Sequence, residues 1–258
     1  MSLRPLLDAY AAVLGLIAGS YLNVVVYRLP RGLSTVQPRS ACPACGAPIG
    51  VRDNLPLLSF ALLGGRCRAC RAPISWRYPL VEAITAALFL ACLERFGLSL
   101  AALAAAIFCC LMIALALIDL EHQLLPDRLT LPGIAAGLVL QIWLPWAGGP
   151  WRALAAAALG AGVLLAIRGA WFLARREEAM GLGDVKMIAL MGAFLGWQGM
   201  LVALFFASLA GSLAGLALMW RGGAGLRTRL PFGTFLALGG LFALFAGREI
   251  AAWYAGLL

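Results

Sequence analysis

The segment Ala104–Leu120 reads AAAIFCCLMIALALIDL, and every side chain in it except one is apolar. Asp119 is the exception, in a chain that has only 11 acidic residues. A carboxylate next to hydrocarbon costs about 2.5 to 3.5 kcal/mol on membrane-insertion scales. The length and composition of the segment predict a membrane helix, and the acid at its end predicts a functional group.

A second acid, Asp184, opens the apolar segment Asp184–Trp197 directly after the glycine-rich sequence GLG at 181–183. Glycines let the backbone approach a neighbouring group closely, and Lys186 follows two residues later. Two carboxyl groups on facing helices can share one proton and activate a water molecule, as in aspartic proteases. Asp119 and Asp184 are therefore the first candidates for catalysis.

The composition indicates that the solvent of this protein is a lipid bilayer. Hydrophobic residues make up 63% of the 258 residues and charged residues only 12%. A single water-soluble core cannot bury this much apolar surface, so we predict an all-α polytopic membrane protein with about eight transmembrane helices. The predicted spans are approximately 6–27, 80–96, 99–119, 129–146, 152–173, 184–198, 200–220 and 231–247.

The basic residues predict the orientation in the membrane. The net charge of +9 comes from nineteen arginines and one lysine, and seven of these arginines lie between residues 30 and 79. Because cytoplasmic loops carry the excess of positive charge, this loop is predicted to be cytoplasmic and both termini periplasmic. Asp119 and Asp184 then both fall at the cytoplasmic face. The same rule explains the basic charge, so binding to nucleic acid is not needed to account for it. The sequence also has no basic patch interleaved with aromatic residues, which nucleic-acid binding would favour.

Residues 30–79 also contain two CxxC pairs, Cys42 with Cys45 and Cys67 with Cys70. Each pair places two sulfurs on one tight turn, and four thiolates suit a tetrahedral zinc ion at Zn–S distances of about 2.3 Å. Two disulfides or unused thiols are the alternative, but a cytoplasmic loop is kept reducing. The segment has few large apolar residues, so a structural zinc would supply its folding free energy.

Other residues near the two aspartates have a structural and a functional interpretation. Asp127 follows Pro126 before a predicted span, so it is either a helix N-cap or part of the site. Asp184 can likewise cap the helix that it begins. Asp119 ends an apolar helix, where a negative charge opposes the helix dipole, which favours a functional role.

Several segments, in this order and spacing, resemble the bacterial type IV prepilin peptidase family. The matching motifs are GSYLNVVVYRLP at 19–30, NLP at 54–56, GRC at 65–67, ISWRYPLVE at 74–82, ID at 118–119, LPDRLT at 125–130, GLGDVK at 181–186 and the two CxxC pairs. Any one of them is weak on its own, but together they are specific and extend over almost the whole chain.

The resemblance implies a multi-pass enzyme of the bacterial inner membrane, an aspartyl protease of the GxGD type. Such enzymes remove the basic leader of type IV prepilins and pseudopilin precursors after a glycine. They then methylate the new N-terminal amine with S-adenosylmethionine. The resemblance places the catalytic aspartates at Asp119 and Asp184, and which of them starts protonated stays open. The expected supporting residues are Asp127, Gly181, Gly183 and Lys186.

The expected organisation is a first transmembrane helix (1–29), a cytoplasmic zinc-binding domain (30–79) and a membrane peptidase domain (80–258). The zinc-binding domain is associated by resemblance with methyl transfer, although no strand–glycine–helix unit for a cofactor is present. Gly65, Arg77 and Glu82 are candidate contributors to methyl transfer. Each also has a structural interpretation: a turn glycine, a lipid-facing arginine and an acid at a helix N-terminus.

Two other functions fit parts of the sequence. A transporter would use membrane carboxylates to bind a proton or cation, but it predicts acids near the bilayer midplane and repeated broken helices. A non-catalytic scaffold that presents a zinc ribbon to a partner explains the cysteines but not the aspartates. Ion flux without peptide cleavage would favour the transporter, and unchanged pilus or secretion phenotypes in Asp→Asn variants would favour the scaffold.

Overall fold

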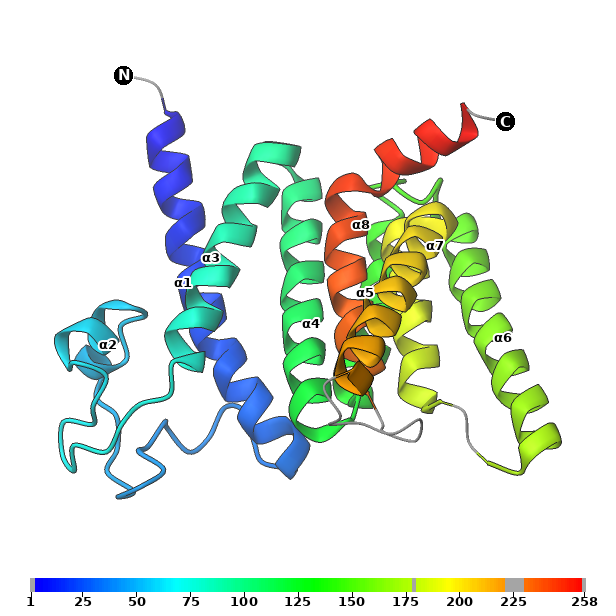
Figure 1. Cartoon of the computed structure of the whole chain (residues 1–258). Helices are drawn as coiled ribbons and strands as arrows, with labels where there is room; N and C mark the ends of the chain where they lie inside the picture. Colours follow the sequence, from blue (N-terminus) through cyan, green and yellow to red (C-terminus); the bar gives the residue numbers. More distant parts are fainter. Residues whose placement is uncertain (1–2, 178–179, 221–229, 257–258) are drawn as a thin grey trace. The chain divides into compact units, whose positions relative to one another are not determined.

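The computed structural model describes residues 3–177, 180–220 and 230–256, and in this part of the chain it contains helices, turns and two isolated β-bridges but no strand (Figure 1). The α-helices are α1 (Arg4–Arg28), α2 (Leu58–Leu62), α3 (Arg77–Phe96), α4 (Leu100–His122), α5 (Asp127–Leu140), α6 (Pro150–Arg175), α7 (Leu182–Trp220) and α8 (Phe232–Ala255). Two 3₁₀ turns cover Leu29–Arg31 and Val51–Asp53. The predicted all-α fold class is confirmed.

Five described helices are long and apolar enough to cross a bilayer, namely α1, α4, α6, α7 and α8. They account for six of the eight predicted spans, because α7 contains both 184–198 and 200–220. The other two predicted spans correspond to α3, which has charged residues near both ends, and to α5. The prediction of a full span at 129–146 is wrong in extent, since α5 has 14 residues. Its length is about 21 Å, against a hydrocarbon core of about 30 Å.

The element α7 consists of two helices joined at Gly196, whose φ of 72° and ψ of −177° lie outside the helical region. The chain reverses direction there, so that the first and last residues of α7 lie toward the same end of the helices (Figure 1). This backbone conformation favours glycine. A Cβ at Gly196 would also lie 2.9 Å from that of Ala147. The two spans predicted within 184–220 are thus present as two helices of opposite direction.

The break at Gly196 removes helical partners from nearby carbonyl groups, and a buried glutamine replaces them. The Nε2 atom of Gln141 donates to the carbonyl oxygens of Ala193 at 3.3 Å and Phe194 at 3.1 Å. Its Oε1 atom accepts the N–H of Ala147 at 2.9 Å. Because Gln141 is only 2% exposed, water does not take over these contacts if the amide is lost.

We expect Gln141→Leu to lower the free energy of unfolding by about 1 to 3 kcal/mol, because it leaves buried polar groups without partners. Thermal unfolding of purified protein in one detergent would measure the change. Gln198→Leu is the matched control, since Gln198 is exposed just beyond the same break. Equal melting temperatures for the two variants would contradict this role of Gln141.

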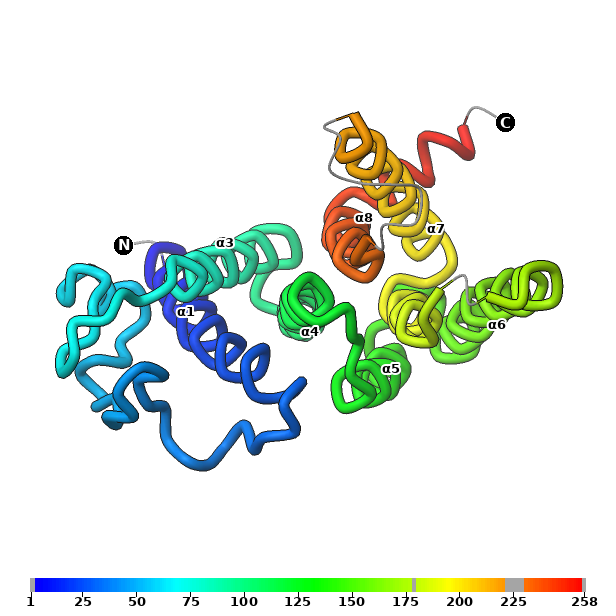
Figure 2. Tube along the Cα trace, turned by 60° about the horizontal axis from the view of Figure 1, so that its bottom comes forward, coloured from blue at the N-terminus to red at the C-terminus, as the bar shows by residue number. Residues whose placement is uncertain are grey.

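The chain divides within α4 into two compact units, residues 1–114 and 115–258, which are described separately. In the first unit, α3 packs against α1 (Figure 2). Glycines on α1 permit this close approach, because a Cβ at Gly15 would lie 2.5 Å from the Cα of Ala86 and one at Gly19 would lie 2.7 Å from the Cα of Glu82. In the second unit, α7 packs against α5, α6 and α8.

Candidate active site and metal centre

Asp119 lies in the last turn of α4 and is only 5% exposed. Its Oδ2 atom accepts a hydrogen bond from the backbone N–H of Thr234 at 2.7 Å, and the Thr234 hydroxyl lies 3.2 Å from the same oxygen. Thr234 is in the first turn of α8. The positive end of the α8 dipole therefore faces the Asp119 carboxylate. The negative end of the α4 dipole disfavours charge on Asp119, and the start of α8 offsets this effect.

Gly233 makes this contact between α4 and α8 sterically possible. A Cβ at Gly233 would lie 2.9 Å from the carboxyl carbon of Asp119 and 3.0 Å from Cδ1 of Leu125. Real Cβ atoms essentially never come closer than 3.0 Å to such a neighbour. A larger residue at Gly233 would thus push α8 away from the acid.

Asp184 lies in the first turn of α7 and is partly buried. Its carboxylate forms a hydrogen bond with the backbone of Gly181, three residues earlier, which is the contact of a capping residue. The capping interpretation of Asp184 is therefore compatible with the structure, and it leaves one carboxylate oxygen for another partner.

The two aspartates lie at one site. Gly183, which precedes Asp184, and Gly233, which contacts Asp119, share the buried Leu125 as a neighbour. A Cβ at Gly183 would lie 2.7 Å from the Cβ of Leu125, which also contacts Gly233. The end of α4 and the starts of α7 and α8 thus meet around one leucine.

Asp127 and Lys186 form an ion pair in which Oδ1 and Nζ are 2.5 Å apart. Asp127 is the first residue of α5, and Pro126 is the N-cap without a side-chain capping bond, so the N-cap interpretation of Asp127 is wrong. The pair joins the starts of α5 and α7. Since the Asp127 side chain is 57% exposed, the pair contributes at most about 1 kcal/mol, and positioning is its larger effect.

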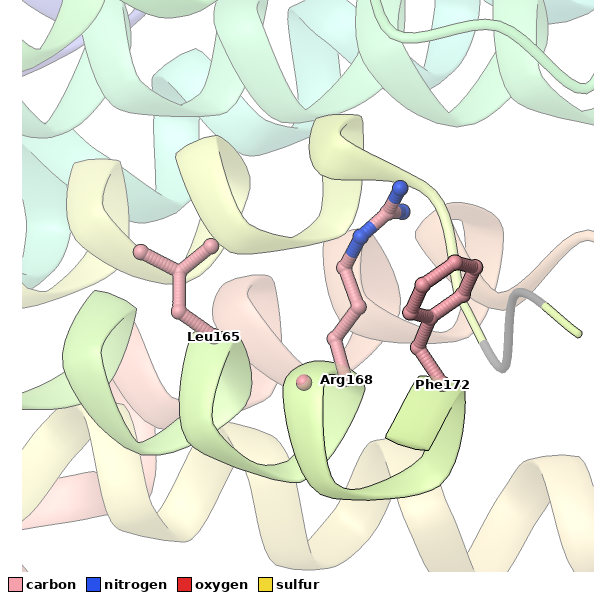
Figure 3. Close-up of a pocket in the computed structure, with 4 residues that line it drawn as sticks. Leu165, Arg168 and Phe172 are labelled. Atoms are coloured by element: carbon pink, nitrogen blue, oxygen red, sulfur yellow. The ribbon is translucent and has the colours of Figure 1, made fainter. Parts of the chain in front are cut away.

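Arg168 on α6 donates a hydrogen bond to the carbonyl of Met180, directly before the GLG sequence. Figure 3 shows its side chain reaching from α6 between Leu165 and Phe172, with which it lines a pocket of about 300 Å³. Arg168 thus fastens the backbone that leads to Asp184. No sequence motif had pointed to this arginine.

Comparison with known proteins identifies the family. Residues 106–216, which contain both aspartates, match the type IV leader peptidase family, and residues 13–96 match the bacterial peptidase A24 N-terminal domain. The chain belongs to the type IV leader peptidase family. It is therefore an enzyme, a membrane peptidase, as the motifs predicted.

Relatives in this family cover nearly all of the chain. A Burkholderia pseudomallei protein named prepilin leader peptidase/N-methyltransferase is 41% identical over 268 residues, 93% of this chain and 85% of the relative. Proteins of the same name from Myxococcus xanthus and Pseudomonas aeruginosa are 44% and 37% identical. These alignments cover 87% and 97% of this chain, and 67% and 97% of the relatives. No solved structure matches the chain.

The four predicted metal ligands come together in the N-terminal part of this family member. The Sγ atoms of Cys42, Cys45, Cys67 and Cys70 lie within 4.8 Å of one another, and all four are free thiols. Tetrahedral zinc with Zn–S bonds of about 2.3 Å separates its sulfurs by roughly 3.8 Å. The Sγ atoms of Cys42 and Cys70 are already 3.9 Å apart, so a small contraction accommodates the ion.

The two cysteine turns have the same backbone pattern. The N–H of Gly46 donates to the Cys42 carbonyl at 2.8 Å, and the N–H of Arg71 donates to the Cys67 carbonyl at 3.0 Å. Gly46 and Arg71 both have a positive φ, of 72° and 59°. A non-glycine residue in this conformation is strained, so the second turn holds Arg71 there against its intrinsic preference.

The thiols of the cluster differ in acidity. Backbone hydrogen bonds from Cys45 and Ala44 lower the pKa of Cys42 to about 7. The backbone of Ala72 favours the Cys70 thiolate, but the neighbouring sulfurs outweigh it and raise the pKa of Cys70 to about 11. Four adjacent thiols therefore do not ionise together without a cation, and a metal ion held by the four sulfurs would supply that charge.

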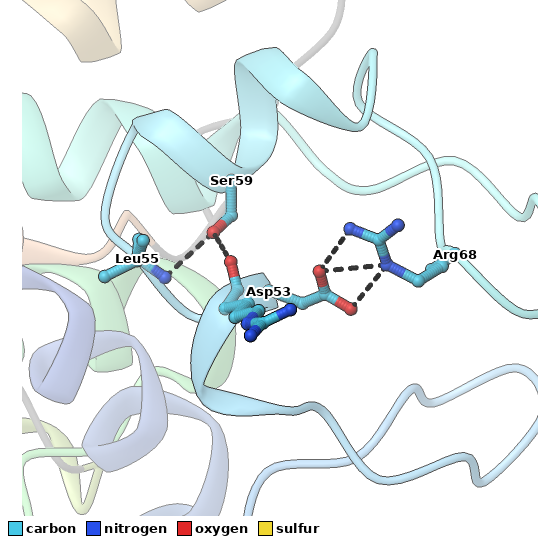
Figure 4. A network of polar contacts seen from close by, with 5 residues as sticks. Asp53, Leu55, Ser59 and Arg68 are labelled. Carbon is cyan, nitrogen blue, oxygen red and sulfur yellow. Dashed lines mark hydrogen bonds and ion pairs between the residues drawn. The ribbon is translucent and has the colours of Figure 1, made fainter.

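Polar contacts hold the rest of this small cysteine-rich region (Figure 4). Arg68 donates to both carboxylate oxygens of Asp53, at 2.7 to 3.0 Å, and its guanidinium lowers the pKa of Asp53. The Ser59 hydroxyl accepts the N–H of Leu55 and donates to the Arg52 carbonyl. The exposed Asp53–Arg68 ion pair contributes little free energy of folding, so it cannot substitute for a hydrophobic core. Its effect is to orient the second cysteine turn, which contains Arg68.

The three candidate methyl-transfer residues lie in the first unit. Gly65 has a φ of 66°, as expected of a turn glycine. Arg77 is half-buried, with its guanidinium over the Tyr78 ring. Glu82 is not at a helix N-terminus, because α3 begins at Arg77. Instead it is buried, and its Oε2 accepts the N–H of Leu57 at 2.8 Å, which fastens the polar segment to α3.

Proposed function

We propose that this chain removes the basic leader of type IV prepilins or pseudopilin precursors and methylates the new N-terminal amine, with Asp119 and Asp184 as the catalytic residues of cleavage. The convergence of the two acids at one site around Leu125 carries the proposal. The shared name of the three relatives supports both activities.

The two carboxyl groups can perform hydrolysis if one is ionised and the other protonated, because two adjacent charges are costly. The ionised group takes a proton from water, whose oxygen forms a bond with the scissile carbonyl carbon. The protonated group donates a hydrogen bond to the carbonyl oxygen. It then gives its proton to the leaving amine as the C–N bond breaks.

A prepilin suits a site at the membrane boundary. Its leader is basic, its following helix lies in the bilayer, and cleavage after glycine falls between the two. We propose that the active site and the cysteine-rich domain are cytoplasmic and that both termini are periplasmic, in the bacterial inner membrane. The arginines that support this orientation include Arg221, Arg227 and Arg229, which lie outside the described residues.

We further propose three parts for the chain: a first transmembrane helix (1–29), a four-cysteine zinc domain (30–79) and a membrane peptidase domain (80–258). A structural Zn²⁺ would be held by Cys42, Cys45, Cys67 and Cys70 and would leave no open position for catalysis. S-adenosylmethionine would supply the methyl group, and Gly65, Arg77 and Glu82 stay candidates for positioning it or the amine.

Mass spectrometry of a synthetic prepilin in lipid vesicles, with purified protein and with or without S-adenosylmethionine, tests the proposal. We expect the leader to be lost in both samples and a methyl group to be added only with the donor. Loss of the leader without methylation would limit the function to peptidase activity. No cleavage by folded protein would contradict the proposal, and ion flux in the same vesicles would then favour a transporter.

A further inference from the structure

We propose that the first turn of α8 assigns the roles of the two aspartates, with Thr234 holding Asp119 as the ionised general base and leaving Asp184 as the group that starts protonated. Thr234 is thereby a positioning residue that acts through Asp119. This inference rests on the proposed function, in which the two carboxyl groups carry out cleavage. It extends to α8, which lies beyond residues 106–216 that match the peptidase family.

The donors at Asp119 match a carboxylate rather than a carboxylic acid. The backbone N–H and the hydroxyl of Thr234 both lie at Oδ2 of Asp119, 2.7 and 3.2 Å away. Oδ2 therefore acts as an acceptor, and an ionised carboxylate has the lone pairs to accept both donors there. Charge-assisted hydrogen bonds of this kind are about twice as strong as neutral ones, so they favour the ionised form.

The Thr234 hydroxyl also lies near a second acceptor. Its oxygen lies 3.1 Å from the carbonyl oxygen of Ala116, one turn before Asp119 on α4. The hydroxyl has one hydrogen, so it donates to only one of these two oxygens at a time. A charged carboxylate is the stronger acceptor, so an ionised Asp119 takes that hydrogen. Gly233 keeps α8 close enough to α4 for this contact.

Asp184 is held differently. Its partner is the backbone of Gly181 in the capping contact, and Lys186, two residues along α7, is paired with Asp127 instead. The N-terminus of α7 favours charge on Asp184, but Asp119 has two donors on one oxygen. When one negative charge is present, it therefore resides on Asp119 and keeps the proton on Asp184.

Among the residues that the structure describes, few titratable groups lie on the elements that meet at Asp119. Asp184 and Lys186 come from α7, Asp127 from α5, and Glu121 and His122 follow Asp119 on α4, where they contact one another. The first turn of α8 contributes no titratable side chain. A change of the Thr234 hydroxyl therefore alters hydrogen bonding at the site without changing any formal charge.

The test is the pH–rate profile of prepilin cleavage for wild type, Thr234→Val and Thr234→Ser in vesicles. Valine keeps the shape of threonine and removes the hydroxyl. We expect Thr234→Val to lower kcat by about 10- to 100-fold, the effect of one hydrogen bond to a charged group, with little change in KM. The acidic limb should move to higher pH, because a carboxylate with one donor fewer takes up a proton more easily. Thr234→Ser keeps the hydroxyl, so its kcat and the position of its acidic limb should be close to those of wild type.

Thr85→Val is the control, because Thr85 is a buried threonine on α3 whose hydroxyl donates to a carbonyl of its own helix. It should leave the acidic limb in place. If Thr234→Val does not fold, Thr234→Ala replaces it and must move the same limb. The role assignment is overturned if folded Thr234→Val has the pH–rate profile of wild type. It is also overturned if Thr234→Ser has a kcat as low as that of Thr234→Val. Absence of cleavage by wild type would instead refute the proposed function.

Discussion

Asp119→Asn and Asp184→Asn should each lower the rate of leader removal by about 10²- to 10⁴-fold, the range for loss of a general acid or base. Asparagine nearly reproduces the size of aspartate but neither ionises nor delivers an acidic proton. In Asp119→Asn the amide oxygen still accepts the N–H of Thr234, so the contact between α4 and α8 survives. We therefore expect the Asp119→Asn variant to have a lower kcat and to stay folded.

Cleavage of the synthetic prepilin by each variant, followed by mass spectrometry, measures the effect. Glu121→Gln is the control, since it removes another negative charge from the end of α4, two residues after Asp119. It should cleave within a few-fold of wild type. A precleaved peptide should still be methylated by both aspartate variants, which shows that they are folded. Cleavage that persists in both would exclude these acids and point to Asp127.

The two catalytic candidates were predictable from the sequence because each is an acid beside a long apolar run. Their pairing at one face was also predicted, but 64 residues separate them, and only the packing of α4, α7 and α8 shows that Leu125 is their common neighbour. Thr234 and Gly233 were missed for a related reason. A threonine and a glycine at the start of an apolar run are ordinary in a membrane helix, and their role depends on the partner that α8 meets.

The fold was predictable to the level of apolar segments. Hydropathy located the helices and separated 184–198 from 200–220, but it did not show how the chain reverses there or where α5 ends. The reversal at Gly196 depends on its conformation and on the carbonyl partners that Gln141 supplies, both of which are tertiary features. Similarly, α5 ends at Leu140 although apolar residues continue beyond it, because the following segment turns and Gln141 faces α7.

Replacement of the first cysteine of each pair, Cys42→Ser with Cys67→Ser, should abolish metal binding and unfold the segment 30–79 while cleavage continues. The cysteine-rich segment, as described, contains short helical turns and the Asp53–Arg68 ion pair but little apolar core, so nothing else replaces the metal. Structural zinc provides apparent binding free energies of about 10 to 16 kcal/mol in small zinc-finger peptides, more than the Asp53–Arg68 pair contributes. We expect about one zinc per chain in wild type and none in the variant.

Metal analysis of purified protein, limited proteolysis of the segment and the cleavage and methylation assays together test this prediction. Cys110→Ala is the control, because Cys110 lies on α4 apart from the four-cysteine cluster, and it should keep the zinc. Methylation should decrease when the metal is lost. Leader cleavage should continue, because Asp119, Asp184 and Thr234 all belong to the second unit. Wild-type protein that contains no metal, yet cleaves and methylates normally, would refute the structural zinc. Equal loss of both activities in the variant would show that the peptidase site also depends on the cysteine-rich segment.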